Sequence, residues 1–273
     1  MSFQERAKRH LTLYKENSLF ILESGLWKKN NRSYAHILPE EMKDLNLLSF
    51  YRKELSDYIH ARNIHLHQDF HHLNSSQAAC LNFFFPMLKE NRIDLLLELL
   101  ELNQEEAVTV KFEKIVSQRE ATNFDFYIEL NTGRKIFFEI KFTEAGFGKV
   151  SDLPKYRKKY KEIYQYTLEG KIRRDVDTYS ALISNYQLLR NISYVDANRN
   201  DLLIVICPEA NTKLRNEFDI VINEIVDPHL HNKIRFLTWE WMLSEILKKL
   251  ELTKSYDRFN EHYTQFANKY IFD

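Results

Sequence analysis

The stretch that decides the fold is FDFYIELNTGRKIFFEIKFTEAGFG, residues 124–148. Apolar and polar side chains alternate on both sides of its central NTG tripeptide, a pattern typical of β-strands. Residues 131–133 suit a three-residue hairpin loop, with Gly133 in the left-handed conformation. The sequence therefore predicts a β-hairpin with strands over residues 124–130 and 135–142.

The loop also predicts the register of this hairpin. If Leu130 pairs with Arg134, Asp125 lies directly across from Glu139, and the two-residue period of a strand places Lys141 on the same face. The opposite face would then carry the apolar side chains of Phe124, Phe126, Phe138 and Ile140. One face thus gathers two carboxylates and an ammonium group, while the other contributes to the core.

Two carboxylates that face each other on adjacent strands repel, with their Cβ atoms about 5 Å apart, and a cation between them relieves the repulsion. Mg²⁺ prefers oxygen ligands and needs only one or two carboxylates besides water and phosphate. The predicted metal ligands are therefore Asp125, Glu139 and the backbone carbonyl of Ile140, with Mn²⁺ as a substitute ion. Lys141 could orient or deprotonate an attacking water, or neutralise charge that builds on a phosphate. The pattern outlines a site that hydrolyses phosphodiester bonds.

Helical segments precede the hairpin. Apolar residues recur at spacings of three and four over residues 39–62, which predicts an amphipathic helix. Ser75 or Ser76 can N-cap a second helix, which Pro86 should kink or end. A third helix is expected over residues 92–102.

Strands and helices alternate from residue 108 onward. Period-two alternation predicts a strand over residues 108–116, and the uniformly apolar run LLIVIC at 202–207 predicts a central strand buried on both faces. A helix is expected over residues 177–192. A short strand at 234–237 precedes a helix that Thr238 can cap.

This order of elements predicts an α/β protein with a mixed β-sheet, an αβββαβ core, flanked by helices. No linker divides the chain, so a single domain is expected over residues 1–273. It would comprise a helical N-terminal extension over residues 1–74, a core over residues 75–250 and a C-terminal helix over residues 251–273.

Composition narrows the class of protein. Because 39 basic residues balance 39 acidic ones, only a local basic surface would bind a polyanion. The hydrophobic share of 44% is ample for a core and argues against disorder. Two cysteines, both in apolar runs, cannot form a disulfide framework, which favours the cytoplasm. Charges run through residues 1–30, and no apolar stretch of about 18 residues exists, so neither a signal peptide nor a membrane contact is expected.

Asp125, followed by the tripeptide Glu139-Ile140-Lys141, resembles the D-(x)n-(D/E)-x-K signature of the PD-(D/E)xK nuclease superfamily, which has the restriction-endonuclease-like fold. The predicted element order matches the core of that fold as well. The resemblance covers roughly residues 75–240 and implies that the two acids hold Mg²⁺ while Lys141 assists hydrolysis. The proline that names the motif is absent, since Phe124 precedes Asp125.

Three further strings, SSQAACLNFF, EIKFTEAGFG and YQLLRN, resemble a bacterial branch of this superfamily described as restriction-type nucleases. This closer resemblance implies auxiliary catalytic residues at Gln77, Glu113 and Gln187.

Residues 149–174 hold nine Lys or Arg residues against three acidic ones, with four tyrosines interleaved. Cations mixed with stacking rings are what a nucleic-acid groove requires. The predicted nucleic-acid contacts are Lys155, Arg157, Lys158 and Lys159, together with Arg190, which shares a helix face with Gln187. Equally, the stretch could be a solvated helix whose tyrosines pack inward at spacings of four.

A cluster of five histidines between residues 60 and 72 raises a second metal hypothesis, since His67 and His71 stand at the helical i, i+4 spacing. No cysteine or HExxH motif accompanies them, so an ordinary polar loop before a helix is favoured.

The favoured function is a Mg²⁺-dependent nuclease with nucleic acid, DNA rather than RNA, as its partner. The main alternative is a catalytically inactive nucleic-acid-binding module on the same fold. Asp125, Glu139 and Lys141 could instead form only a solvated strand face. A structural or partner-binding protein would be favoured if Lys141 paired with Glu129 or Glu144 away from any cleft. The sequence leaves open whether the protein forms a homodimer.

Overall fold

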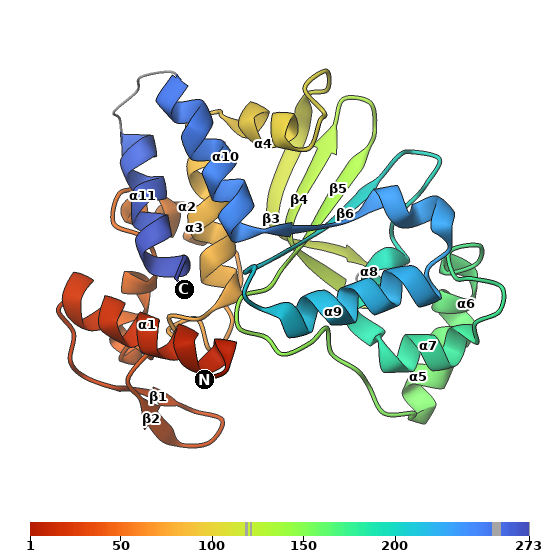
Figure 1. Cartoon of the computed structure of the whole chain (residues 1–273), viewed down its shortest axis with the longest axis horizontal. Coiled ribbons are helices and arrows are strands. Elements are labelled where there is room, and N and C mark those ends of the chain that lie inside the picture. Colours follow the sequence, from red (N-terminus) through yellow and green to blue (C-terminus); the bar gives the residue numbers. More distant parts are fainter. Residues whose placement is uncertain (118–119, 121, 253–257, 273) are drawn as a thin grey trace.

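The computed structural model describes residues 1–117, 120, 122–252 and 258–272. Its centre is a five-stranded sheet in the order β3-β4-β5-β6-β7, with helices on both faces (Figure 1). The strands are β3 (Ala107–Ser117), β4 (Thr122–Leu130), β5 (Lys135–Ile140), β6 (Leu202–Cys207) and β7 (Ile234–Thr238). The first three form an antiparallel meander, whereas β6 and β7 add in parallel. The predicted α/β architecture with a mixed sheet is confirmed.

Strand β6 shows why two helical layers are needed. All six of its residues are buried, as expected for a run without polar positions. Leu202, Ile204 and Ile206 face one apolar core, while Leu203 and Val205 face another. The sheet therefore has no solvent-facing side at its centre.

Helices from both ends of the chain cover the first face. They are α3 (Ser76–Lys89), α4 (Ile93–Leu99), α10 (Trp239–Leu252) and α11 (Arg258–Tyr270). Ser75 caps α3 and the Thr238 hydroxyl accepts the Trp241 N–H at 3.2 Å, so both predicted caps are confirmed. Of the predicted C-terminal helix, α11 is observed, while residues 253–257 and 273 lie outside the described residues.

Pro86 lies inside α3, which continues to Lys89, so the proline does not end the helix. A proline removes the hydrogen bond to the carbonyl four residues earlier, here that of Asn82. His262 of α11 donates to this carbonyl through Nε2 at 2.7 Å. A long-range contact thus satisfies the group that the proline leaves free.

The second face is covered by shorter pieces. They are α5 (Pro154–Lys159), the π-helix η2 (Tyr160–Tyr164), α6 (Gln165–Thr167), α7 (Thr178–Ser184), α8 (Tyr186–Ile192), α9 (Thr212–Ile220), the π-helix η3 (Val221–Ile225) and the 3₁₀ helix η4 (Pro228–Lys233). Asn185 leaves the helical conformation at φ −131° and ψ 44°. The helix predicted over 177–192 is therefore two helices, α7 and α8.

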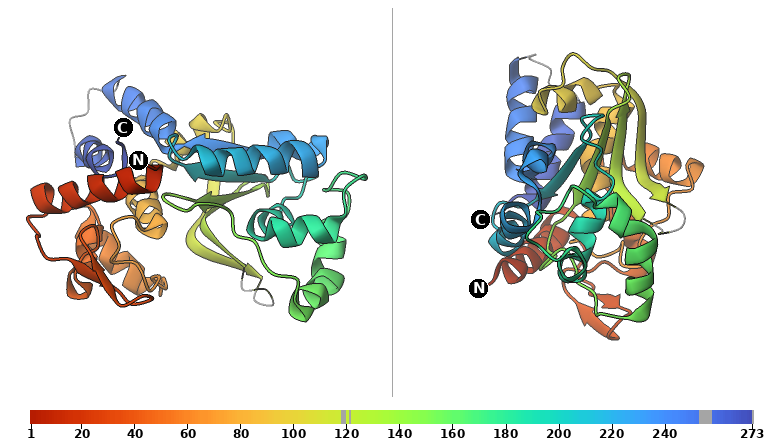
Figure 2. Two further views of the ribbon diagram at one scale, coloured as in Figure 1. Left: turned by 60° about the horizontal axis from the view of Figure 1, so that its bottom comes forward. Right: turned by 90° about the vertical axis from the view of Figure 1, so that its right-hand side faces the viewer.

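The N-terminal extension differs most from expectation. It contains α1 (Phe3–Ser18), a small hairpin of β1 (Gly25–Trp27) and β2 (Arg32–Tyr34), the 3₁₀ helix η1 (Glu40–Asn46) and α2 (Arg52–Ala61). The hairpin was not predicted, and the helix predicted over 39–62 is two elements. Helix α1 packs beside α11 (Figure 2). His10 of α1 stacks on Phe272, just after α11, with ring centroids 4.7 Å apart. Within the described residues, no helix is both long and apolar enough to span a membrane.

Candidate active site

The hairpin that carries the predicted site forms with the predicted turn and register. The Leu130 N–H donates to the carbonyl of Arg134 at 2.9 Å, and Gly133 has φ 83°, in the left-handed region that glycine tolerates. Phe126 pairs with Phe138, as the register requires. Turn and register are confirmed.

The last regular pair between β4 and β5 is Phe126 with Phe138, so the pairing stops one residue short of Asp125 and Glu139. At this point the Ile140 N–H donates to Oδ2 of Asp125 at 2.7 Å. The Asp125 side chain therefore bridges the two strands where their ladder stops, and Glu139 lies on the neighbouring strand.

One apolar residue is not where the alternation placed it. Phe126 packs with Phe138 on the α3 face of the sheet, but Phe124 lies in the other core, with its ring centroid 4.6 Å from that of Phe137. The strict two-residue period fails across Asp125, because β4 changes the direction of its side chains where regular pairing ends. The expectation for Phe124 was wrong.

Glu139 is the centre of a buried polar network. Its Oε1 accepts from Gln187 Nε2 at 2.7 Å and from Lys141 Nζ at 2.8 Å, and its Oε2 accepts from Asn191 Nδ2 at 2.7 Å. Lys141 also donates to Gln187 Oε1 at 3.0 Å. Glu139 and Lys141 are only 4% and 6% exposed, so water scarcely competes for these bonds. The structure brings Glu139, Lys141 and the predicted auxiliary residue Gln187 together.

Asn191 is a residue of this network that the sequence reasoning missed. It is fully buried and follows Gln187 by four positions, so both face β5 from α8. The string YQLLRN carries this signal, because Gln187 and Asn191 stand four positions apart in it. Asn191 holds the second oxygen of Glu139 and fixes the orientation of that carboxylate.

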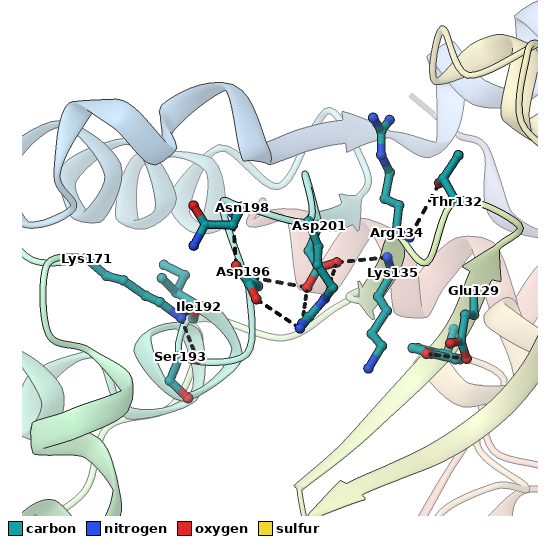
Figure 3. A network of polar contacts seen from close by, with 12 residues as sticks. Glu129, Thr132, Arg134, Lys135, Lys171, Ile192, Ser193, Asp196, Asn198 and Asp201 are labelled. Atoms are coloured by element: carbon teal, nitrogen blue, oxygen red, sulfur yellow. Dashed lines mark hydrogen bonds and ion pairs between the residues drawn. The ribbon is translucent and has the colours of Figure 1, made fainter.

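A second network fixes α8 and the loop behind it. Lys171 donates to the carbonyl of Ser193 at 2.6 Å, just beyond the C-terminus of α8, as Figure 3 shows. Asp201 accepts from the Lys135 N–H at 2.9 Å and from the Asp196 N–H at 3.1 Å. These contacts tie the start of β5 to the loop before β6, so that α8 presents Gln187 and Asn191 to Glu139.

The other two auxiliary residues also lie together. Gln77 of α3 donates to Oε1 of Glu113 at 2.7 Å, and Asn123 donates to the other oxygen of Glu113. Glu113 has φ 49°, an unfavourable value for a residue other than glycine in the middle of a strand. Such strain persists only where the surrounding structure holds it, and it is common at functional sites.

Electrostatics link the two groups of residues. Burial raises the pKa of Asp125 well above its ordinary value, and the negative charges of Glu139 and Glu113 raise it further. Burial raises the pKa of Glu113 as well. Burial alone would lower the pKa of Lys141, but the carboxylates of Glu139 and Glu144 raise it overall, so the ammonium form is retained. Asp125 thus experiences an excess of negative charge that a cation would relieve.

The partner of Lys141 bears on the alternative functions. Lys141 pairs with Glu139, while the Glu144 carboxylate accepts the Phe142 N–H at 2.6 Å. The condition set for a structural protein, a Lys141 pair with Glu129 or Glu144, is therefore not met. The burial of Glu139 and Lys141 also contradicts a solvated strand face.

The predicted nucleic-acid contacts lie mainly on α5. Lys155, Arg157 and Lys158 are exposed, and Lys159 is half-buried. Arg157 donates through Nε to Asp152 at 2.8 Å, and Lys158 lies 3.9 Å from Glu162. The remaining predicted residue, Arg190, is half-buried on α8.

Three of the four tyrosines of this stretch are buried or half-buried, as expected for a structural helix, whereas Tyr166 is 67% exposed. Tyr164 is fully buried, and Tyr156 contacts Tyr186 with ring centroids 5.0 Å apart. Because Tyr186 precedes Gln187, α5 lies beside the end of α8 that meets Glu139. The same segment therefore packs most of its rings inward and leaves Lys155, Arg157 and Lys158 exposed beside the N-terminus of α8.

The histidine hypothesis finds no support. Within the described residues, no group of three or more His, Cys, Asp or Glu side chains is arranged to hold a metal ion. His71 instead lies 3.3 Å from Glu40, and His72 lies 3.5 Å from Asp69.

Comparison with known proteins places the chain in a family. No curated protein and no solved structure matches it significantly. A family model with the description "Restriction Endonuclease associating with ARP" matches residues 8–271, nearly the whole chain. The chain therefore belongs to this restriction-endonuclease-like family.

Proposed function

We propose that this protein is a Mg²⁺-dependent nuclease of the PD-(D/E)xK type that hydrolyses phosphodiester bonds of DNA. The observation that carries the proposal is the position of Asp125 and Glu139 on neighbouring strands, where β4 and β5 separate, with Lys141 bonded to Glu139. Membership of a restriction endonuclease family supports a nuclease-related role. By its family description, the protein would associate with ARP.

The donor groups suit a hard divalent ion. Of the four lone-pair positions of a carboxylate, Asp125 uses one for the Ile140 N–H, and Glu139 uses three. Asp125 and Glu139 would hold Mg²⁺ together with the carbonyl of Ile140, and substrate phosphate and water would complete the ligands. When bound, Mg²⁺ supplies a Lewis acid that polarises the phosphoryl oxygen.

Lys141 would act on the substrate side of the acids. An ammonium group has three donors, and two of those on Lys141 point to Glu139 and Gln187. The third would donate to a phosphate oxygen or to the attacking water. A retained positive charge at this point neutralises the charge that develops on the phosphate. Gln187 and Asn191 keep Glu139 and Lys141 in place.

A cleavage assay on mixed DNA and RNA substrates, with Mg²⁺ or Mn²⁺ and with a chelator, tests the proposal. Metal-dependent cleavage of DNA is expected. If the protein binds DNA but does not cleave it with any divalent metal, the nuclease proposal is wrong and the inactive nucleic-acid-binding module is favoured.

Metal binding should raise the thermal stability of the protein. A ligand that binds only the native state stabilises it, by about 2.7 kcal/mol at a concentration 100-fold above Kd. We therefore expect the melting temperature of the metal-free protein to rise on titration with millimolar Mg²⁺ or Mn²⁺. Asp125→Asn should abolish the rise, and Asp175→Asn, at an exposed acid, should keep it. A wild-type melting temperature that stays constant would argue against the metal site.

The cations of α5 should contribute to affinity. For duplex DNA, the slope of log K against log salt becomes shallower by about 0.9 for each phosphate that the protein no longer neutralises. Reversal of Lys155, Lys158 and Lys159 to Glu should therefore weaken DNA binding and flatten its salt dependence, as measured by fluorescence anisotropy. The matched control reverses three exposed lysines elsewhere: Lys8, Lys28 and Lys248. Equal affinities for the two triple variants would assign α5 a purely structural role.

A further inference from the structure

The loop before α3 holds one histidine ring beside a nearly buried carboxylate. The side chain of His67 is 51% exposed, and its Nε2 lies 4.0 Å from Oε1 of Glu113, which is only 10% exposed. The buried amide of Gln77 fixes both partners. Its Oε1 accepts the His67 N–H at 2.8 Å, and its Nε2 donates to Glu113 at 2.7 Å and to the carbonyl of His65 at 3.0 Å. The ring is therefore held at the solvent side of Glu113.

The strand register places Glu113 in line with the two predicted metal ligands. Phe126 of β4 pairs with one phenylalanine on each neighbouring strand, Phe112 and Phe138. One position further along these antiparallel strands, Asp125 stands between Glu113 of β3 and Glu139 of β5. The negative charges of both neighbours add to the effect of burial in raising the pKa of Asp125. Three acidic residues thus form a row across three adjacent strands, and His67 lies at one end of it.

His67 and Lys141 reach this row from opposite faces of the sheet. Gln77, which holds the His67 loop, belongs to α3 on the first face, whereas Gln187, which binds Lys141, belongs to α8 on the second face (Figure 1). In an in-line displacement at phosphorus, the attacking and leaving oxygens lie on opposite sides of the phosphorus atom. A polar group on each face is the arrangement that such a reaction requires.

The two groups differ in what they can do with a proton. The carboxylates near Lys141 keep it in the ammonium form, and its donors are directed to Glu139 and Gln187. Histidine is the side chain that ordinarily exchanges a proton near neutral pH, and the ring of His67 is accessible to solvent. His67 is therefore the better placed of the two to donate a proton and to be recharged.

We propose that His67 is the general acid of the reaction and donates a proton to the sugar oxygen that leaves phosphorus. The inference rests on the proposed nuclease function and adds a catalytic residue to it. Water attacks phosphorus and releases one proton to solvent. The bond between phosphorus and the leaving oxygen breaks with its electron pair on that oxygen, and the imidazolium proton of His67 completes the new hydroxyl group. Solvent then returns a proton to the imidazole.

A sulfur substitution in the substrate tests this role. His67→Ala should lower the single-turnover cleavage rate by about 10²–10⁴-fold, the usual contribution of general acid catalysis. The probe carries sulfur in place of the leaving oxygen of the cleaved linkage, which product mapping with wild type locates. A thiolate leaves without a proton, because a thiol, with a pKa of about 8.5 for cysteine, is a far stronger acid than water at about 15.7.

On the sulfur probe, we expect His67→Ala to cleave within about tenfold of wild type, because protonation of the leaving group is no longer needed. Lys141→Ala should stay slow on both substrates. His65→Ala is the matched control in the same loop, where the carbonyl of His65 rather than its ring binds Gln77, and it should cleave both substrates like wild type. Melting temperatures must show that each variant is folded.

A second readout does not require cleavage. In metal-free buffer with a chelator, diethyl pyrocarbonate should modify the half-exposed ring of His67, and a saturating hairpin duplex of DNA should protect it. His229, whose side chain is equally exposed at 51%, is the control and should react to the same extent with and without DNA. Mass spectrometry of proteolytic peptides measures both modifications.

Three outcomes would overturn the role of His67 while leaving the nuclease proposal intact. They are a His67→Ala variant that cleaves ordinary DNA as fast as wild type, an equal loss of rate on the oxygen and sulfur substrates, and a His67 ring that DNA does not protect. Failure of the nuclease proposal looks different, because wild type then cleaves neither substrate with any divalent metal, and the general acid role is lost with it.

Discussion

Lys141→Ala should reduce DNA cleavage by about 10²–10³-fold or more, while affinity for DNA changes little. Removal of a donor aimed at charge that develops during the reaction affects the transition state far more than the bound substrate. Lys141 is buried beside Glu139 at 2.8 Å, in a place where few waters could substitute for its ammonium group. The decrease should therefore appear in the rate of the chemical step.

The measurement is a single-turnover cleavage rate at saturating enzyme, with DNA affinity determined in parallel by anisotropy. Lys135→Ala is the matched control, because Lys135 lies at the other end of the same strand and only its backbone N–H binds Asp201. Circular dichroism must show that both variants are folded at the assay temperature. If Lys141→Ala cleaves as fast as wild type, the catalytic role assigned to this lysine is wrong.

Lys141→Met should lower the free energy of unfolding by about 3–5 kcal/mol in metal-free buffer, because it leaves Glu139 as a buried charge without its cation. The side chains of Glu139 and Lys141 are only 5% and 7% exposed, so solvent cannot replace the missing ammonium group. Gln187 and Asn191 would still donate to the carboxylate, but neutral amides do not compensate a full charge. Urea denaturation measures the change in stability.

The double variant Glu139→Gln, Lys141→Met should recover most of this stability, since it removes both charges together. The exposed pair Lys53 and Asp57, at 86% and 66% exposure, provides the control cycle, with an expected coupling of only about 0.3–0.5 kcal/mol. If Lys141→Met lowers the free energy of unfolding by less than about 1 kcal/mol, Glu139 takes up a proton or rearranges toward solvent in the variant.

Much of the fold could be predicted because the deciding signals are local. The NTG loop has one favourable hairpin geometry, the run LLIVIC has no polar position for solvent, and Ser75 and Thr238 cap the helices that follow them. Each signal depends on residues a few positions apart, so it acts in the same way in any tertiary context.

The features that the sequence left open or misplaced depend on distant partners. Pro86 was expected to kink or end α3, and the helix does not end there, because His262 satisfies the carbonyl of Asn82, 180 positions away along the chain. Phe124 joins the second core because β4 and β5 separate at Asp125, and neither the alternation nor the turn indicates where a ladder ends.

For the candidate site, the sequence by itself determined the hairpin register, which brings Asp125 and Glu139 onto neighbouring strands, and the spacing that puts Lys141 beside Glu139. Those relations follow from one turn and from the period of a strand. Only the tertiary structure decided which side chains complete the site. Gln187 and Asn191 reach Glu139 from 48 and 52 positions away, and Gln77 reaches Glu113 across 36. Such contacts depend on how α8 and α3 pack against the two faces of the sheet, which is set by burial of the whole core rather than by any short stretch of chain.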